Sequence, residues 1–245
     1  MNRFIRSIQG RIERRLGETN PLIQVVVGPR QVGKTTSIQG ATDSMPRLYQ
    51  TADSPVPFPA SIIREWWSAA LALKDSSTIP VLIIDEAQKI EGWSEVIKEL
   101  WDAQPGALKV VISGSAALAI EKGLRETLSG RYELIRADHW SLAEASSAFG
   151  TDLHQYLGFG CYPGAERFAA ERPRWADYVR DSIIEPAIGR DLLLVHPVEK
   201  PALLRQVFHV ATANPAQVIS LQKIVGQLQD RGAVETIQKY LELLS

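Results

Sequence analysis

The residues best suited to chemistry form one short motif near the amino end of the chain. Residues 28–35 read Gly-Pro-Arg-Gln-Val-Gly-Lys-Thr, which fits the phosphate-binding pattern Gly-x-x-x-x-Gly-Lys-Thr. Glycines allow a tight turn in which several backbone N–H groups point at one anion. Lys34 adds positive charge for the outer phosphates, and the Thr35 hydroxyl can ligate Mg²⁺. We therefore predict a phosphate site made of Gly28, Pro29, Arg30, Gln31, Val32, Gly33, Lys34, Thr35 and Thr36.

A pair of acids follows an apolar run further along the chain. Residues 81–84 read Val-Leu-Ile-Ile, as a buried strand would, and Asp85 and Glu86 come directly after them. A nucleotide-hydrolysing site needs a carboxylate at such a strand end to hold Mg²⁺, and Asp85 suits that role. Glu86 can face the terminal phosphate and act as general base for the attacking water. With the phosphate loop, the pair predicts Mg²⁺-dependent hydrolysis.

Two serines follow the strand-like run 108–112. The carboxyl ends of parallel strands lie at one edge of a sheet, so Ser113 and Ser115 are expected near the phosphate loop. Either hydroxyl can hydrogen-bond the terminal phosphate or the attacking water, and the sequence does not distinguish them. A simple role as helix caps is the alternative for both serines.

Arg131 precedes the strand-like run 132–136. An arginine in such a loop can stabilise the terminal phosphate in the transition state, in its own subunit or in the site of a neighbour. The second arrangement requires a homo-oligomer. A surface salt bridge is the alternative role for this residue.

The elements that must position these residues alternate between strands and helices. Strand-like runs lie at 22–27, 47–50, 81–84, 108–112 and 132–136, and helical stretches lie at 34–41, 60–74, 93–103 and 115–128. Alternation of this kind is typical of an α/β fold, in which helices sandwich a parallel sheet. Apolar residues at helical spacing between Phe4 and Leu16 predict an amphipathic helix before the first strand.

After about residue 140 the pattern indicates helices alone. Helical periodicity runs from Trp175 to Leu194, and prolines at 197 and 201 mark a linker. Helical stretches follow at 202–212, 221–228 and 234–244, with Ser220 as an N-cap and a turn at 230–232. We therefore expect a nucleotide-binding core at 1–140, a helical lid at 141–200 and a last segment at 201–245.

Composition excludes several classes of protein. The chain has 245 residues, a net charge of −1 and a single cysteine, which favours a cytoplasmic protein without an internal disulfide. The absence of a long apolar run predicts no membrane span. A GTPase is disfavoured, because Gln88 stands where the Asp-x-x-Gly switch needs glycine and no Asn-Lys-x-Asp motif occurs. ATP is therefore the expected nucleotide.

The motifs taken in order resemble a known group of proteins. They read GPRQVGKTT, LIIDEAQKI, SGSAAL, LSGRYEL, GFGCYPGA, DSIIEPAIGRDLL and KPALLRQVF. This series is similar to that of the prokaryotic AAA-type ATPases, which often carry a C-terminal domain of unknown function. The resemblance runs from about residue 10 to the end of the chain, and it implies a P-loop ATPase of the AAA+ superfamily with an additional-strand core.

The resemblance also implies roles for particular residues. Walker A corresponds to 28–35 and Walker B to 81–86, with a sensor-1-like polar group at Ser113 or Ser115 and an arginine finger at Arg131. In the helical lid, Tyr162 and Pro163 would lie near the adenine, and Arg190 would act as a sensor-2-like group. The tail resembles the start of a helix-turn-helix or winged-helix segment, and the chain looks truncated before the further C-terminal domain.

The leading prediction is an Mg²⁺-dependent ATPase that binds ATP and ADP and serves as a motor or switch. One alternative is a nucleotide-switched DNA-binding regulator. The nearly balanced charge of 201–245 argues against it, because DNA-binding surfaces gather Lys and Arg. A second alternative is an ATP-binding scaffold that hydrolyses ATP very slowly.

Overall fold

The chain divides into two compact units, Met1–Trp175 and Ala176–Ser245. The computed structural model describes residues 4–75, 78–115, 117–195, 198–228 and 234–244. The first unit contains the strands together with a set of helices, whereas the described part of the second unit is helical.

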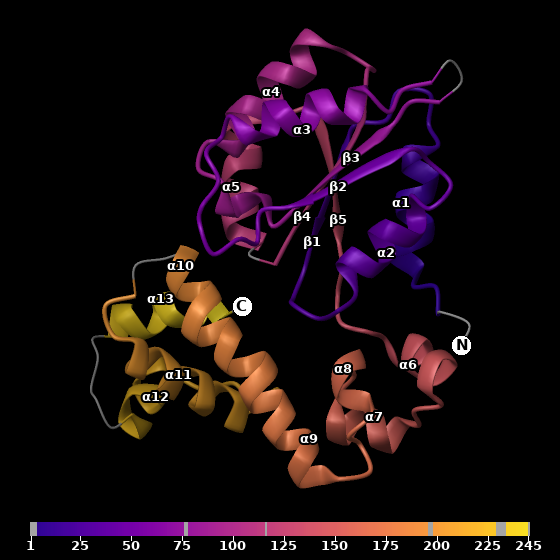
Figure 1. Ribbon diagram of the computed structural model, residues 1–245. Coiled ribbons are helices and arrows are strands. Elements are labelled where there is room, and N and C mark those ends of the chain that lie inside the picture. Colours follow the sequence, from indigo (N-terminus) through magenta and orange to yellow (C-terminus); the bar gives the residue numbers. More distant parts are fainter. Residues whose placement is uncertain (1–3, 76–77, 116, 196–197, 229–233, 245) are drawn as a thin grey trace. The chain divides into compact units, whose positions relative to one another are not determined.

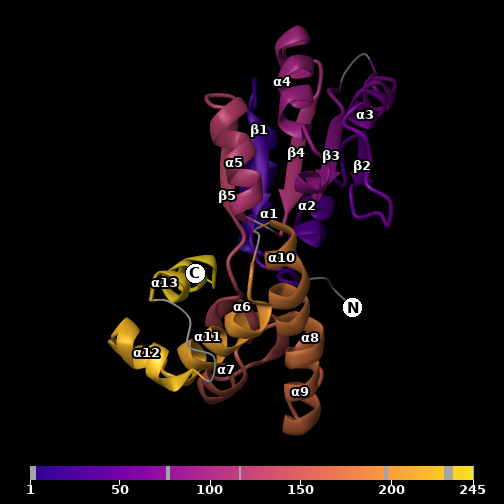
Figure 2. The same ribbon diagram turned by 90° about the vertical axis from the view of Figure 1, so that its left-hand side faces the viewer.

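Within the described residues, the strands form one five-stranded parallel sheet. They are β1 (Ile23–Val27), β2 (Arg47–Thr51), β3 (Val81–Asp85), β4 (Lys109–Gly114) and β5 (Tyr132–Arg136). Their order is β2-β3-β4-β1-β5, as Figure 2 shows. The strand β4 therefore lies between β1, which leads into the phosphate loop, and β3, which carries the acids. The predicted α/β fold with an additional strand is confirmed.

Helices cover both faces of this sheet (Figure 1). One face is covered by α1 (Ser7–Leu16) and α2 (Lys34–Ala41), and the other by α3 (Ile62–Leu71), α4 (Trp93–Ala103) and α5 (Ala117–Thr127). Because side chains alternate along a strand, Val25 and Val27 pack toward α3, α4 and α5, whereas Val26 packs toward α1 and α2. Trp66 and Trp67 are buried in the core.

The rest of the first unit consists of short helices. They are α6 (Leu142–Phe149), α7 (Leu153–Phe159), α8 (Pro163–Glu166) and α9 (Arg172–Val179), which continues into the second unit. Capping boxes fix the starts of α6 and α7, with Ser141 and Glu144 on the first and Asp152 and Gln155 on the second. A small cluster around Trp140 packs these helices against Phe4.

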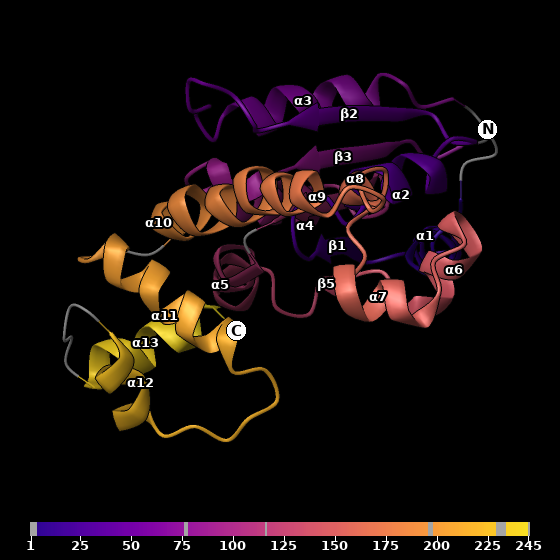
Figure 3. The ribbon, with the colours of Figure 1, turned by 90° about the horizontal axis from the view of Figure 1, so that it is seen from below.

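The second unit has its own core of apolar side chains. Its helical segments are the π-helical turns Arg180–Ile184 and Ala187–Asp191, then α10 (Leu192–Val195), α11 (Pro201–Ala213), α12 (Leu221–Gln227) and α13 (Val234–Leu244). Helices α11, α12 and α13 pack together (Figure 3), with Leu203, Ile224 and Ile237 at their centre. The Ser220 side chain accepts from the Lys223 N–H, which confirms the predicted N-cap. Pro197 and the predicted turn at 230–232 lie outside the described residues.

No helix in the described part of the chain has both the length and the apolar character needed to cross a membrane.

Candidate functional site

The loop between β1 and α2 has the backbone geometry that a phosphate site needs. Gly28 has a φ of 156°, and a Cβ atom there would lie 2.2 Å from the carbonyl oxygen of Ala137. Gly33 has a φ of 92°, in the left-handed region that glycine adopts without strain. Gln31, with a φ of 60°, is also left-handed. Turns that include left-handed residues direct successive N–H groups toward one point, and such a concavity binds anions.

Lys34 is the first residue of α2 and is only 7% exposed. Its Nζ atom donates to the carbonyl oxygens of Gly28 and Pro29, at 2.8 and 2.7 Å. The loop thus holds the ammonium group next to its own backbone amides. A positive charge in this position is available to an anion bound by the loop.

Asp85, at the end of β3, collects hydroxyl groups from neighbouring elements. Its Oδ2 atom accepts from Thr35 Oγ1 at 3.1 Å and its Oδ1 atom accepts from Ser113 Oγ at 2.5 Å. The register of β3 and β4 brings this about, because Asp85 lies opposite Ser113. Carboxylate and hydroxyl oxygens are donors that Mg²⁺ prefers, so Thr35 and Asp85 fit that ion.

Tyr49, on β2, is a member of this network that the sequence interpretation missed. Its hydroxyl donates to Asp85 Oδ2 at 2.7 Å. Burial, together with the adjacent Asp85 carboxylate, raises the pKa of Tyr49 far above its ordinary value, so the phenol keeps its proton and stays a donor. The sequence shows only that Tyr49 lies in the strand-like run 47–50. That its hydroxyl meets Asp85 depends on the strand order, which places β2 next to β3.

Replacing Tyr49 by phenylalanine keeps the ring and removes one donor from Asp85. We expect the Mg²⁺ concentration for half-maximal ATP turnover to rise roughly 3- to 10-fold, the loss of about one ordinary hydrogen bond. Nucleotide affinity measured without Mg²⁺ should not change. Tyr132→Phe, at the opposite edge of the sheet, is the matched control. An unchanged or lower Mg²⁺ requirement would contradict the role of Tyr49.

Glu86 has a left-handed backbone, with φ 56° and ψ 39°, which is uncommon for a residue other than glycine. Strained conformations of this kind gather at functional sites. The Glu86 Oε2 atom accepts from Gln88 Nε2 at 2.5 Å and from Ser115 Oγ at 3.0 Å. The carboxylate is thus held on the rim of the sheet, beside the end of β4.

Gln88 is a second residue whose role the sequence did not indicate. It lies on a short 3₁₀ turn (Ala87–Lys89), and the sequence interpretation used it only to argue against a GTPase. Its Oε1 atom is buried and has no hydrogen-bond partner among the described residues. Gly114 makes room for it, because a Cβ atom at 114 would lie 2.3 Å from this oxygen. Gln88 is therefore packed where it can orient Glu86.

The structure brings both predicted serines to the site but gives them different partners. Ser113 is fully buried and bonded to Asp85, whereas Ser115 is partly buried and bonded to Glu86. Each serine thus contacts its own carboxylate. That one of them, Ser113 or Ser115, senses the terminal phosphate stays a prediction.

Arg131 lies at the end of the strands opposite to the phosphate loop. The register of β1 and β5 pairs Ile23 with Tyr132, so Arg131 is at the amino end of β5, while the phosphate loop follows the carboxyl end of β1. Its Nε and NH2 atoms bind Asp102 at 2.7 and 2.9 Å. The expectation that Arg131 contacts the phosphates of its own subunit is corrected by this geometry. Contact with a neighbour's site stays a prediction.

The residues predicted near the adenine and the phosphates from the lid belong to different units of the chain. Tyr162 caps α8, and Pro163 is the first residue of that helix. The Tyr162 ring packs edge-on against His139, with centroids 4.9 Å apart, and burial raises the pKa of Tyr162. Arg190 belongs to the second unit, and its side chain lies outside the described residues. Thr36 follows Thr35 in the first turn of α2.

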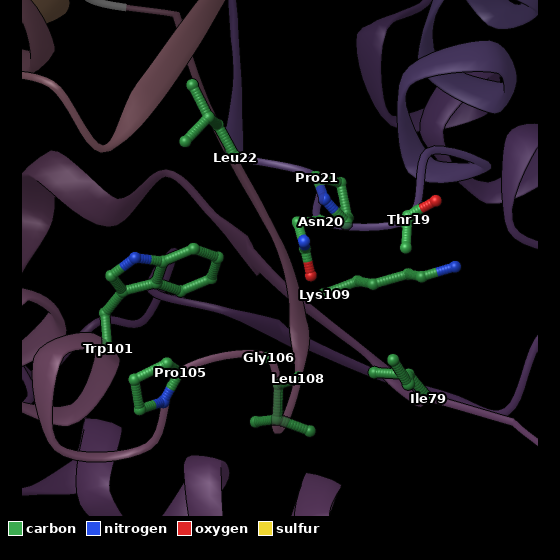
Figure 4. A pocket seen from close by; sticks show the side chains of 10 residues that line it. All are labelled: Thr19, Asn20, Pro21, Leu22, Ile79, Trp101, Pro105, Gly106, Leu108 and Lys109. Atoms are coloured by element: carbon green, nitrogen blue, oxygen red, sulfur yellow. The ribbon is translucent and has the colours of Figure 1, made fainter.

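A pocket of about 380 Å³ lies away from the phosphate loop (Figure 4). Its lining comes from the segment before β1, the end of α4 and the start of β4, which is the edge of the sheet that carries Arg131. Trp101 and Lys109 line it from opposite sides. The pocket is therefore distinct from the predicted nucleotide site.

The strand order, the loop after β1 and the acids at the end of β3 define a P-loop ATPase of the AAA type. The chain belongs to a family described as AAA domain, whose model matches residues 20–146. A second family model, described as a domain of unknown function (DUF8612), matches residues 150–245. This second match covers the helical part of the chain from α7 onward.

Two curated proteins and a solved structure are similar to this chain. An uncharacterized protein of Mycobacterium tuberculosis, Rv2008c, is 27% identical over 223 residues, which are 91% of this chain and 47% of that protein. An uncharacterized protein of Haemophilus influenzae is 27% identical over 172 residues, 66% of this chain and 42% of that protein. The chain thus spans about half the length of these curated relatives. A solved structure, the Walker-type ATPase PABY2304 of Pyrococcus abyssi, matches 99% of this chain and 89% of that chain with a TM-score of 0.62 and 15% identity.

Proposed function

We propose that this chain binds ATP together with Mg²⁺ and hydrolyses it to ADP and phosphate, serving as a motor or switch. The observation that carries the proposal is the joint network at the ends of β3 and β4. In it, Asp85 contacts the phosphate-loop residue Thr35 and the strand residue Ser113, with Glu86 next along the chain. This arrangement supplies a metal-binding carboxylate and a separate general base at the same rim of the sheet.

Thr35 and Asp85 would hold Mg²⁺, directly or through water. When bound, Mg²⁺ neutralises charge on the outer phosphate oxygens. Backbone N–H groups of the phosphate loop and the ammonium group of Lys34 bind the phosphates. Glu86 accepts the proton of the attacking water as the bond between the terminal phosphate and ADP breaks. For this step the Glu86 carboxylate must turn from Gln88 and Ser115 toward the water.

A second candidate function, a nucleotide-binding scaffold with very slow hydrolysis, is favoured by one observation. The Glu86 carboxylate is already engaged by Gln88 and Ser115, at 2.5 and 3.0 Å. If that engagement persists when ATP is bound, the attacking water lacks its base. A DNA-binding role has less support, because α13 carries Glu235 and Glu242 against Lys239.

Further parts of the proposal rest on the sequence. The single cysteine favours a reducing cytoplasm. An arginine finger at Arg131 would require a homo-oligomer, in which one subunit contributes to the site of the next. In this proposal Tyr162 and Pro163 lie near the adenine, and Arg190 acts as a sensor-2-like group.

Steady-state turnover of the full chain tests the proposal. We expect phosphate release from ATP in the presence of Mg²⁺ and its loss when EDTA removes the metal, because Mg²⁺ neutralises the phosphate charge that opposes attack. ATP should also displace a bound fluorescent ATP analogue at lower concentrations than GTP. Turnover that is unaffected by EDTA, or much tighter binding of GTP than of ATP, would contradict the proposal.

A further inference from the structure

Arg6, directly before α1, is a buried cation that contacts several distant segments. It is only 5% exposed. Its guanidinium group donates to the carbonyl oxygens of Val32 at 2.8 Å and of Asp138 at 3.1 Å, and it pairs with Glu144 at 2.9 Å. Val32 is part of the phosphate loop. Arg6 therefore ties the amino-terminal segment, the phosphate loop and the start of α6 to one another.

Trp140 contacts the same point on the phosphate loop. Its indole Nε1 atom donates to the carbonyl oxygen of Val32 at 3.0 Å. The Arg6 guanidinium also lies over the Trp140 ring, 5.0 Å from its centroid, and such a cation–π contact is itself stabilising. The Val32 carbonyl is thus held by two donors that lie far apart in the sequence.

The direction of that carbonyl determines the direction of the next N–H group. In a trans peptide the C=O and N–H groups point to opposite sides of the chain. Holding the Val32 carbonyl toward Arg6 and Trp140 therefore turns the Gly33 N–H the other way. Gly33 is left-handed, with a φ of 92°, and its own carbonyl accepts from the Ser37 N–H at the start of α2. Hydrogen bonds thus hold the backbone on both sides of the Gly33 N–H group, at the carbonyl of Val32 and at the carbonyl of Gly33.

We infer that Arg6 and Trp140 are positioning residues of the phosphate loop, which orient the Gly33 N–H toward the phosphates of the bound nucleotide. This inference rests on the proposed function. Neither residue touches the nucleotide in this role, since both act through the Val32–Gly33 peptide. The ligand chemistry concerned is the phosphate chain, and the adenosine part of the nucleotide does not enter into it.

Glu144 completes the arrangement by balancing the charge of Arg6. It accepts from Arg6 Nε and NH2, and it is also the N3 residue of the capping box of α6. Burial alone would raise the pKa of Glu144, but the hydrogen bonds from Arg6 and from the Ser141 and Ser7 backbone outweigh it and hold the pKa below its ordinary value. The ionised carboxylate keeps the guanidinium oriented toward the loop.

The test compares Trp140→Phe and Arg6→Met with the unsubstituted full chain by calorimetric titration with pyrophosphate, ATP and adenosine. Trp140→Phe keeps an aromatic ring and removes one donor, so its affinity for pyrophosphate and ATP should fall roughly 2- to 10-fold. Arg6→Met keeps the apolar stem and removes a charged donor, so its loss should reach roughly 10- to 100-fold. Adenosine affinity should stay unchanged, which a general defect in folding would not produce.

Trp67→Phe is the matched control. It also removes an indole hydrogen bond, to Gln104 Oε1 at 3.0 Å, but on the face of the sheet covered by α3 and α4. Its phosphate affinity should equal that of the unsubstituted chain. Equal losses for adenosine and pyrophosphate in Trp140→Phe, or no loss at all, would overturn the inference alone. If the unsubstituted chain bound neither ATP nor pyrophosphate, the proposed function itself would be refuted.

Discussion

Glu86→Gln is expected to reduce ATP turnover by roughly 100- to 10,000-fold, the contribution that a positioned general base makes. ATP binding should stay within about twofold of the unsubstituted chain, because glutamine has the same shape and keeps an acceptor for Gln88 and Ser115. Turnover is measured as phosphate release under saturating ATP and Mg²⁺, and binding by calorimetry. The large effect on the rate and the small effect on affinity together identify a group that acts in the transition state.

The controls for Glu86→Gln separate the two candidate functions. Glu91→Gln changes an exposed acid that follows the same strand and should leave turnover unchanged. If the unsubstituted chain binds ATP but its turnover is already negligible, and Glu86→Gln does not lower it further, the slow scaffold is the better description. In that case Gln88→Ala becomes informative, because it frees the Glu86 carboxylate from one of its partners.

Lys34→Ala is expected to weaken ATP binding by at least about 30-fold, since truncating one partner of a desolvated charge pair typically removes about 2 kcal/mol or more. The Lys34 side chain is nearly buried and already held by carbonyl oxygens of the loop. Little conformational freedom is then lost when a phosphate binds, so most of the attraction contributes to affinity. The measurement is a titration with ATP in the presence of Mg²⁺.

Lys109→Ala is the matched control for Lys34→Ala, because Lys109 lies at the amino end of β4, away from the phosphate loop. Its affinity for ATP should not change. Unfolding curves recorded without nucleotide show whether either variant has lost its fold. An Lys34→Ala chain that is folded and binds ATP normally would refute the phosphate site at 28–35.

The sequence predicts the elements of the first unit well because its signals there are local. A tight-turn motif between a β-branched run and a helical stretch indicates its own structure, and α2 and α4 begin and end where the spacing predicts. The acids at the end of the run 81–84 are likewise recognisable from their immediate context. Fold and phosphate loop therefore follow from short stretches of chain.

Some residues of the candidate site could not be recognised from the sequence, because their positions depend on contacts between distant segments. Arg6 is one of several arginines near the amino end, and only the folded chain brings it to Glu144, 138 residues away. The hydrogen bond from Tyr49 to Asp85 forms because β2 lies beside β3 in parallel register. Arg131 precedes β5, and the parallel pairing of β5 with β1 places it at the end of the strands away from the phosphate loop.

Gly114 illustrates a further consequence of this packing. Because it has no side chain, Gln88 and Ile120 pack directly against its backbone, and a methyl group there would meet Gln88 Oε1 and Ile120 Cδ1, at 2.3 and 2.4 Å. Gln88 in turn holds Glu86. If Glu86 is the proposed general base, its position is sensitive to steric bulk at a residue that bears no reactive group, and we expect substitutions at 114 to alter turnover by crowding Gln88.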